Sequence, residues 1–290
     1  MSTPQEMNDL WIGMYVCIHV LFSMEAKKYL WDWISSILKL KKKCVKGMDR
    51  IKKYLEKFDG EKVAVAYSGG VDSSLVAYAA KDIADAVTIK SDFIQNCVIK
   101  DAKEFAKKFG IRHKILNVNI IEDEFKYNPP SRCYLCKKRI IEEIKNLGYN
   151  LILDGTNADD LLEERPGLKA KKEGGVISPL ADLGLGKRET RKIMANIDEK
   201  VARKPSDSCL ATRIPFNSEV TLERLKRIQK AEELIKSMGL RSIRVRDHFP
   251  VARIEAPKDE FNKVSNLGDL ISKLKHLGYQ SVTMDFRDEM

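Results

Sequence analysis

Histidine and long apolar runs are both scarce in this chain of 290 residues. Its four histidines are scattered along the sequence, so we expect no histidine-rich metal site. An apolar stretch at residues 10–24 is too short to span a bilayer, and it follows Glu6 and Asp9 rather than a basic segment. The six cysteines are too few for a disulfide framework in a chain of this length. We therefore expect a cytoplasmic protein whose folded region has no membrane segment.

The charge of the chain suits an anionic ligand. Charged residues make up 32% of the sequence and hydrophobic residues 43%, which is typical of a soluble globular protein. The net charge of +10 favours binding of a nucleotide or an RNA. Because the basic residues are spread along the chain, the charge alone does not choose between these two ligands.

Residues 1–47 differ from the rest of the chain. They combine the apolar stretch with an amphipathic segment at 29–40 that is followed by three lysines. One interpretation is a helix that lies on a membrane surface. We favour the other, an extension produced by a wrongly assigned start codon, because Met48 directly precedes a regular amphipathic helix at 49–58.

From residue 62 onward, strand and helix patterns alternate. Strands are expected at 62–67, 86–90, 112–118 and 150–154, and helices at 73–82, 98–109, 137–147 and 187–195. This order predicts an α/β domain with a doubly wound parallel sheet over residues 48–216, in which ligands bind beyond the carboxyl ends of the strands. Residues 161–217 are otherwise rich in glycine and proline and are expected to form loops. A smaller α+β domain is expected over residues 217–290, with helices at 221–238 and 259–276 and strands at 242–246, 251–255 and 280–286.

The segment from Ser68 to Ser74, with the sequence SGGVDSS, follows the first strand and precedes a helix. Gly69 and Gly70 leave room for a phosphate to reach backbone N–H groups. Ser73 is expected as the N-cap of the helix, whose positive end then faces the anion. No lysine follows the glycines, so the segment is not a GxxxxGKS phosphate-binding loop. The segment resembles the PP-loop of enzymes that split ATP between its α- and β-phosphates.

A second candidate site contains cysteines. Cys133 and Cys136 form a CxxC pair at the start of a predicted helix, and Cys209 lies in a comparable polar segment. Three thiolates would suit a 4Fe–4S cluster with one open iron, but the spacing equally allows zinc or unligated thiols. Cys97 is expected to be a packing residue.

Two further groups of charged residues follow predicted strands or lie on them. Asp159 and Asp160 come after the fourth strand, where carboxylates can bind Mg²⁺. For Asp160 we favour a simple role at the start of a helix. Arg244 and Arg246 share one face of a strand and could clamp a phosphate. The alternative is that acidic residues on nearby strands, Glu255 and Asp285, are their partners.

Taken in order, these motifs resemble the LarE family of ATP-dependent sulfur transferases, which make the organic part of the nickel-pincer cofactor. The resemblance covers residues 49–286. It rests on SGGVDSS, RCYLCK at 132–137, DGTNADD at 154–160, RPG at 165–167, SPL at 178–180, KP at 204–205, CLATRIP at 209–215 and RVR at 244–246.

The resemblance implies an adenine nucleotide α-hydrolase-like fold and an activity. Such enzymes adenylate a carboxylate of a pyridinium mononucleotide and then replace the activated oxygen with sulfur. Asp72 and Cys209 would be catalytic, and Mg²⁺ would bind through Asp72 or Asp159. ATP would contact Ala66, Ser68, Gly69, Gly70, Val71, Asp72, Ser73, Ser74, Ser91, Gly155, Asn157, Asp159 and Arg213. The substrate would contact Arg244, Arg246 and Asp285.

The resemblance also assigns the cysteines. Some members sacrifice the sulfur of a single cysteine at the position of Cys209. Others have cysteines at the positions of Cys133, Cys136 and Cys209 and bind a 4Fe–4S cluster that carries the transferred sulfide. This chain has all three and therefore resembles the cluster type, and we expect a homo-oligomer.

Three other functions remain open on the sequence. A tRNA thiolase also joins a PP-loop to cysteines, and the net charge of +10 would suit tRNA, but no RNA-binding module is recognisable. An amidating ligase such as NAD synthetase shares the loop without needing the three cysteines. The third is a non-catalytic nucleotide-binding protein with a structural metal.

Overall fold

A computed structural model describes residue 33 and residues 46–121, 124–163, 165–205, 208–240, 243–257 and 267–287. The chain divides into two compact units, Met1–Asp49 and Arg50–Met290, and every labelled helix and strand belongs to the second. Apart from residues 33, 46 and 47, the predicted N-terminal extension lies outside the described residues. No helix among the described residues is both long enough and apolar enough to cross a bilayer.

The first sheet has four parallel strands, which confirms the predicted α/β class. They are β1 (Val63–Ala66), β2 (Ala84–Lys90), β3 (His113–Asn117) and β4 (Leu151–Leu153), in the order β3-β2-β1-β4. The chain moves outward from β1 to β3 and then returns to place β4 on the other side of β1. The direction of winding therefore reverses between β1 and β4. In doubly wound sheets, ligands bind at such a reversal.

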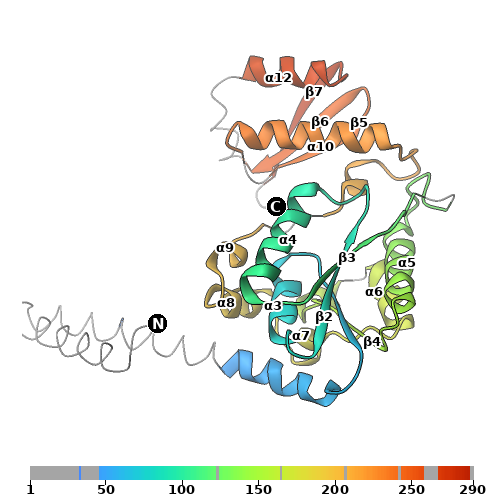
Figure 1. Cartoon of the computed structure of the whole chain (residues 1–290). Coiled ribbons are helices and arrows are strands. Elements are labelled where there is room, and N and C mark those ends of the chain that lie inside the picture. The colour runs from blue at the N-terminus through green and yellow to red at the C-terminus, as the bar shows by residue number, and fades with distance from the viewer. Residues whose placement is uncertain are drawn as a thin grey trace, which may run out of the picture. The chain divides into compact units, whose positions relative to one another are not determined.

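Helices cover both faces of this sheet. Figure 1 shows α3 (Val71–Ala79) and α4 (Asn96–Phe109) on one side, and α5 (Arg132–Asn146) on the other. Helix α5 begins five residues earlier than the sequence pattern predicted. The backbone N–H of Arg132 donates to the carbonyl of Pro129 (2.9 Å), so the turn after the two prolines continues directly into the helix. The CxxC pair consequently lies within the first five residues of α5 rather than in front of it.

The region expected to form loops contains several short helices. They are η2 (Asp159–Leu162), α6 (Pro166–Glu173), α7 (Pro179–Asp182), α9 (Glu199–Ala202) and η3 (Leu210–Arg213), in addition to the predicted α8 (Lys187–Ala195). Both α6 and α7 begin on a proline. A proline at the first helical position does not disrupt the helix, because that N–H group has no intrahelical partner in any case. The loop prediction was wrong for this reason.

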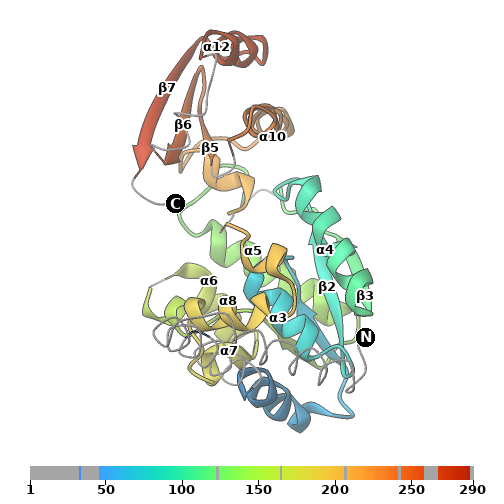
Figure 2. The ribbon, with the colours of Figure 1, turned by 90° about the vertical axis from the view of Figure 1, so that its left-hand side faces the viewer.

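A second sheet lies near the C-terminus. Its strands β5 (Arg244–His248), β6 (Val251–Pro257) and β7 (Ser281–Arg287) run in that order, with β5 antiparallel and β7 parallel to β6. Figure 2 shows α10 (Leu222–Ser237) and α12 (Leu267–His276) on the same side of this sheet. Their apolar side chains form one buried cluster with those of the sheet. The smaller α+β module is therefore present, while its limits at 217–290 stay a prediction.

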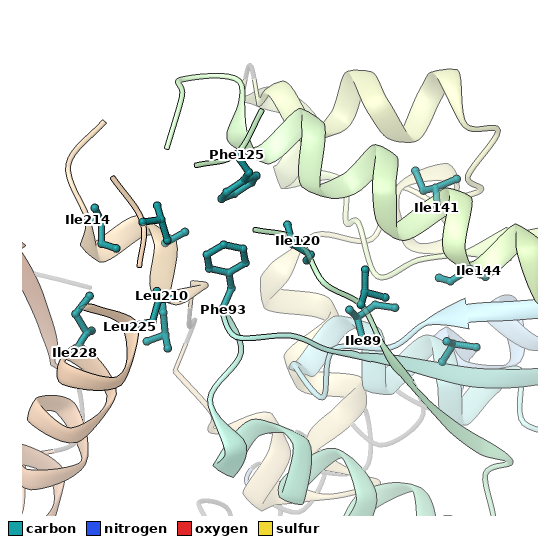
Figure 3. Packing of buried hydrophobic residues seen from close by; sticks show 14 of the residues in the cluster. Ile89, Phe93, Ile120, Phe125, Ile141, Ile144, Leu210, Ile214, Leu225 and Ile228 are labelled. Carbon is teal, nitrogen blue, oxygen red and sulfur yellow. The ribbon is translucent and has the colours of Figure 1, made fainter. Parts of the chain in front are cut away.

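Helix α10 packs into two buried apolar clusters through one continuous face. The first lies beside the four-stranded sheet and the second beside the three-stranded sheet. Leu225 and Ile228 pack in the first core with Phe93 and Leu210, as Figure 3 shows. One turn farther along, Ala231 and Ile235 belong to the core of the second sheet. These positions recur every three or four residues, so they share one side of the helix.

A buried ion pair stands at the junction of the two cores. Arg213 at the end of η3 and Glu232 on α10 are 1% and 0% exposed, and Arg213 Nε lies 2.8 Å from Glu232 Oε1. Glu232 also accepts hydrogen bonds from Gln95 Nε2 (2.7 Å) and from the backbone N–H of Val245 (3.1 Å). One carboxylate thus connects η3, α10, β5 and the residue preceding α4.

We expect Glu232→Gln to lower the free energy of unfolding by about 3–5 kcal/mol, because it leaves the buried Arg213 charge unpaired. The measurement is urea denaturation followed by far-ultraviolet circular dichroism. Asp269→Asn is the control, since it removes the exposed partner of Lys273 and should cost at most about 1 kcal/mol. Equal losses in the two variants would contradict the role given to Glu232.

Candidate functional site

The loop between β1 and α3 is built around two glycines. Gly69 has a φ of +76°, and a Cβ atom there would lie 3.1 Å from the Cβ of Ala102. Gly70 is the N-cap of α3, so the prediction of Ser73 as the cap was wrong. Ser73 lies in the first turn, where its hydroxyl accepts from the N–H of Ser68 (3.2 Å). The first N–H groups of α3 have no intrahelical acceptors, which makes this helix end suitable for an anion.

Gly155, just after β4, lies against the first turn of α3. A Cβ atom at Gly155 would be 2.4 Å from the backbone nitrogen of Ser73 and 2.8 Å from the carbonyl carbon of Asp72. Only glycine permits this approach. The end of β4 therefore meets the start of α3 at the reversal point of the sheet.

Asp72 on the first turn of α3 is held by two neighbouring side chains. Thr190 Oγ1 donates to Asp72 Oδ1 (2.6 Å), and Asn157 Nδ2 donates to Asp72 Oδ2 (3.1 Å). Desolvation raises the pKa of Asp72, while these two hydrogen bonds act in the opposite direction. A fixed carboxylate beside an anion site is a suitable ligand for Mg²⁺.

A cavity of about 340 Å³ opens at the reversal point. Its lining includes seven residues predicted for the nucleotide, namely Ala66, Ser68, Gly70, Val71, Asp72, Ser73 and Gly155. It also includes four basic side chains that the sequence analysis missed, Lys137, Lys171, Lys187 and Arg191. These four come from α5, α6 and α8, so no local motif marks them as one group. Their positive charge favours a polyanionic ligand.

Two of the four basic groups are matched by carboxylates in the cavity wall. Lys171 Nζ lies 2.5 Å from Asp154 Oδ2, and Lys187 Nζ lies 3.2 Å from Asp160 Oδ1. Desolvation acts to raise the pKa of Asp154, but Lys171 and the hydroxyl of Thr156 lower it below its ordinary value. Asp154 therefore stays ionised and fixes the position of Lys171.

Six predicted nucleotide-site residues, all in the described part of the chain, do not line the cavity. They are Gly69, Ser74, Ser91, Asn157, Asp159 and Arg213. Asn157 contacts Asp72 instead, and Asp159 Oδ2 accepts from the N–H of Lys187 (2.7 Å) at the start of α8. The adjacent Asp160, for which a role at a helix start was favoured, lines the cavity in its place. The assignment of these six residues to the nucleotide stays a prediction.

The segment before α5 is tied to the segment that contains Cys209. Asn128 is fully buried with a φ of +49°, and its Nδ2 donates to the carbonyls of Ala211 (3.2 Å) and Ile214 (2.8 Å). Arg132 Nη1 also donates to the carbonyl of Ala211 (3.3 Å). Because Ala211 is two residues after Cys209, these bonds bring Cys209 next to the CxxC turn.

The three thiols lie close enough to affect one another. Burial raises the pKa of Cys136 to about 11, with smaller contributions from Cys209 and Cys133, and desolvation and Cys133 raise the pKa of Cys209. Within the described ranges, no group of three or more His, Cys, Asp or Glu residues is arranged to hold a metal ion. The three thiols thus have the chemistry that an iron–sulfur cluster needs. Within the described residues they are not arranged as a complete set of metal ligands. Cys97 is exposed, so its expected packing role was wrong.

The predicted substrate residues lie on one face of the second sheet. Arg244 is paired in register with Glu255, and Glu255 with Asp285. Arg246 Nε lies 2.9 Å from Glu255 Oε1, and Arg246 Nη1 donates to the carbonyl of Thr212. The alternative that Glu255 is a partner of these arginines is confirmed for Arg246. A substrate role for Arg244, Arg246 and Asp285 stays a prediction.

Comparisons with known proteins agree with this geometry. Residues 44–134 match the NAD synthase family model. An uncharacterized protein of Synechocystis sp. is 37% identical over 245 residues, which cover 80% of this chain and 91% of the relative. An uncharacterized protein of Methanocaldococcus jannaschii is 35% identical over 250 residues, covering 84% and 96%. The pyridinium-3,5-bisthiocarboxylic acid mononucleotide synthase of Lactiplantibacillus plantarum is 28% identical over 238 residues, covering 78% and 86%.

We expect Gly155→Ala to weaken ATP binding at least about tenfold, because the new Cβ would displace the first turn of α3 and cost one or more charge-assisted hydrogen bonds. Isothermal titration calorimetry measures the affinity. Gly148→Ala is the control. Gly148 has a φ of +82° and open space around it, so alanine there should cost about 1–2 kcal/mol of stability and leave ATP affinity unchanged. Unaltered ATP affinity in Gly155→Ala would contradict the proposed close approach.

Proposed function

The chain belongs to the LarE family of PP-loop enzymes, and on this basis we propose that it is an ATP-dependent sulfur transferase. Its substrate would be a pyridinium mononucleotide with a carboxylate that becomes a thiocarboxylate. The observation that carries the proposal is the basic cavity between the ends of β1 and β4, with the glycine loop on one side and Gly155 on the other.

The first step would be adenylation. A carboxylate oxygen of the substrate attacks the α-phosphorus of ATP, the bond to the bridging oxygen breaks, and pyrophosphate leaves with the electron pair. Backbone N–H groups at the start of α3 and the hydroxyls of Ser68 and Ser73 would hold the pyrophosphate. Mg²⁺ bound through Asp72 or Asp159 would offset the phosphate charge.

The second step would replace AMP by sulfur at the acyl carbon. Cys133, Cys136 and Cys209 would hold a 4Fe–4S cluster, which when bound would present the transferred sulfide on its fourth iron. The support from the chain itself is the set of hydrogen bonds from Asn128 and Arg132 that bring Cys209 to the CxxC turn. Those bonds would orient the three thiols.

Arg244 and Arg246 would hold the phosphate of the mononucleotide. Asp285, on the neighbouring part of the same face, would contact another part of the substrate. Arg246 is already oriented by Glu255, so its guanidinium would bind without a large loss of side-chain freedom.

An amidating ligase is the second candidate, favoured by the match of residues 44–134 to the NAD synthase family. The adenylation step would be the same, but ammonia rather than sulfur would attack. The matched region ends before Cys136 and Cys209, so it does not account for those two residues.

ATP should be cleaved to AMP and pyrophosphate, and isotope exchange between ATP and pyrophosphate should depend on the pyridinium carboxylate. Asp72→Asn should lower this exchange at least about a hundredfold, since the variant loses a charge that the site needs for Mg²⁺. Asp82→Asn is the control, because Asp82 is exposed and lies beyond the other end of α3. ADP and phosphate as products would exclude the proposal. Exchange that depends on a nicotinate dinucleotide instead would favour the amidating ligase.

Anaerobically reconstituted protein should contain about four irons per chain. It should also show a broad absorption band that arises from thiolate-to-iron charge transfer. Cys133→Ala, Cys136→Ala and Cys209→Ala should each lose this iron, whereas Cys97→Ala, which alters an exposed residue on α4, should retain it. Iron analysis and electron paramagnetic resonance make the comparison. Stoichiometric zinc without iron would rule out the cluster.

A further inference from the structure

Arg191 on α8 contacts the main chain of a separate segment and also lines the cavity. Its Nη1 donates to the backbone carbonyls of Ala202 (2.7 Å) and Lys204 (2.9 Å). The same side chain lines the cavity, and its charge acts on Asp72 in the first turn of α3. Two main-chain carbonyls therefore hold one side of the guanidinium. The Arg191 side chain also lines the ligand cavity.

The remaining hydrogen-bonding capacity of Arg191 suits a phosphate. Five N–H groups belong to a guanidinium, and the two on Nη1 are used by the two carbonyls. Among the residues that the structure describes, the N–H groups on Nε and Nη2 have no protein acceptor. A guanidinium that is already oriented can bind phosphate through two parallel hydrogen bonds.

The balance of charge in the cavity separates Lys137 and Arg191 from the other two basic residues. Lys171 and Lys187 are paired with Asp154 and Asp160. Within the described ranges, neither Lys137 nor Arg191 makes an ion pair with a carboxylate, and Arg191 differs from Lys137 because two main-chain carbonyls hold its guanidinium. The charge of Arg191 acts on Asp72 without a direct ion pair, so the N–H groups of its guanidinium remain available to the ligand.

The segment that Arg191 holds also contacts the glycine loop, through the side chain of Lys204. Lys204 Nζ lies 2.8 Å from Asp101 Oδ2 and donates to the carbonyl of Gly69 (3.4 Å). Pro205 lines the cavity. Residues 202–205 are thus attached both to the loop and, through Arg191, to the cavity, and they lie shortly before Cys209 in the chain.

We propose that Arg191 is a phosphate-binding residue of the nucleotide site that also positions residues 202–205 beside the bound nucleotide. This inference rests on the proposed function, since it takes the cavity to be the ATP site. The segment that leads to Cys209 is then aligned with the phosphates by the side chain that binds them.

Binding of α,β-methylene-ATP and of adenosine to the full-length protein provides the test. Arg191→Met should weaken binding of the ATP analogue about 10- to 100-fold and leave adenosine affinity unchanged, because adenosine has no phosphate. Arg191→Lys should recover part of the loss, since lysine keeps the charge but not the two-pronged contact. Arg188→Met is the matched control, because Arg188 is an exposed residue on the same helix.

Hydrogen exchange of the amides at 199–204 tests the positioning role. The ATP analogue should slow this exchange in the wild-type protein and in Arg188→Met, but not in Arg191→Met at saturating ligand. Retained slowing in Arg191→Met would exclude the positioning role.

Equal weakening of both ligands in Arg191→Met would show an effect on folding alone, and no weakening would show that Arg191 does not bind phosphate. Either result overturns the inference while leaving the proposed function intact. Failure of the wild-type protein to bind the ATP analogue would instead overturn both.

Discussion

The ion pair between Arg213 and Glu232 is the interaction on which the arrangement of this molecule most depends. It is fully buried, and Glu232 also accepts from Gln95 before α4 and from the backbone of β5. Arg213 in turn donates to the carbonyl of Ser208 (2.7 Å), next to Cys209. Loss of either partner would leave a buried charge uncompensated, so this pair fixes the segment of Cys209 relative to α10.

A second constraint acts at the nucleotide end of the site. The absence of a side chain at Gly155 lets the end of β4 contact the first turn of α3, and the φ of Gly69 turns the loop toward the same point. Gly155 and Gly69 are thus required for the path of the backbone and not for a side-chain reaction. Gly155 lines the cavity, and so do the basic side chains from α5, α6 and α8.

Each candidate site is held together by short, specific contacts to main-chain carbonyls. Asn128 joins the CxxC turn to η3, and Arg191 joins the cavity to residues 202–205. Hydrogen bonds to backbone carbonyls hold a segment whatever its side chains are, so such contacts can fix a catalytic segment that has little regular structure of its own.

The sequence by itself determined the parallel sheet and the glycine loop, because each depends on local order along the chain. Strand and helix periods are local, and the turn from β1 into α3 is marked by the SGGVDSS segment itself. It did not determine where α5 starts, since a proline pair was taken as a break rather than as a turn into a helix. Only the tertiary structure decided that Arg191 and Lys171, from separate helices with no shared motif, face one cavity, and that Arg213 pairs with Glu232. Those contacts join residues distant in the chain, and no local pattern encodes such distances.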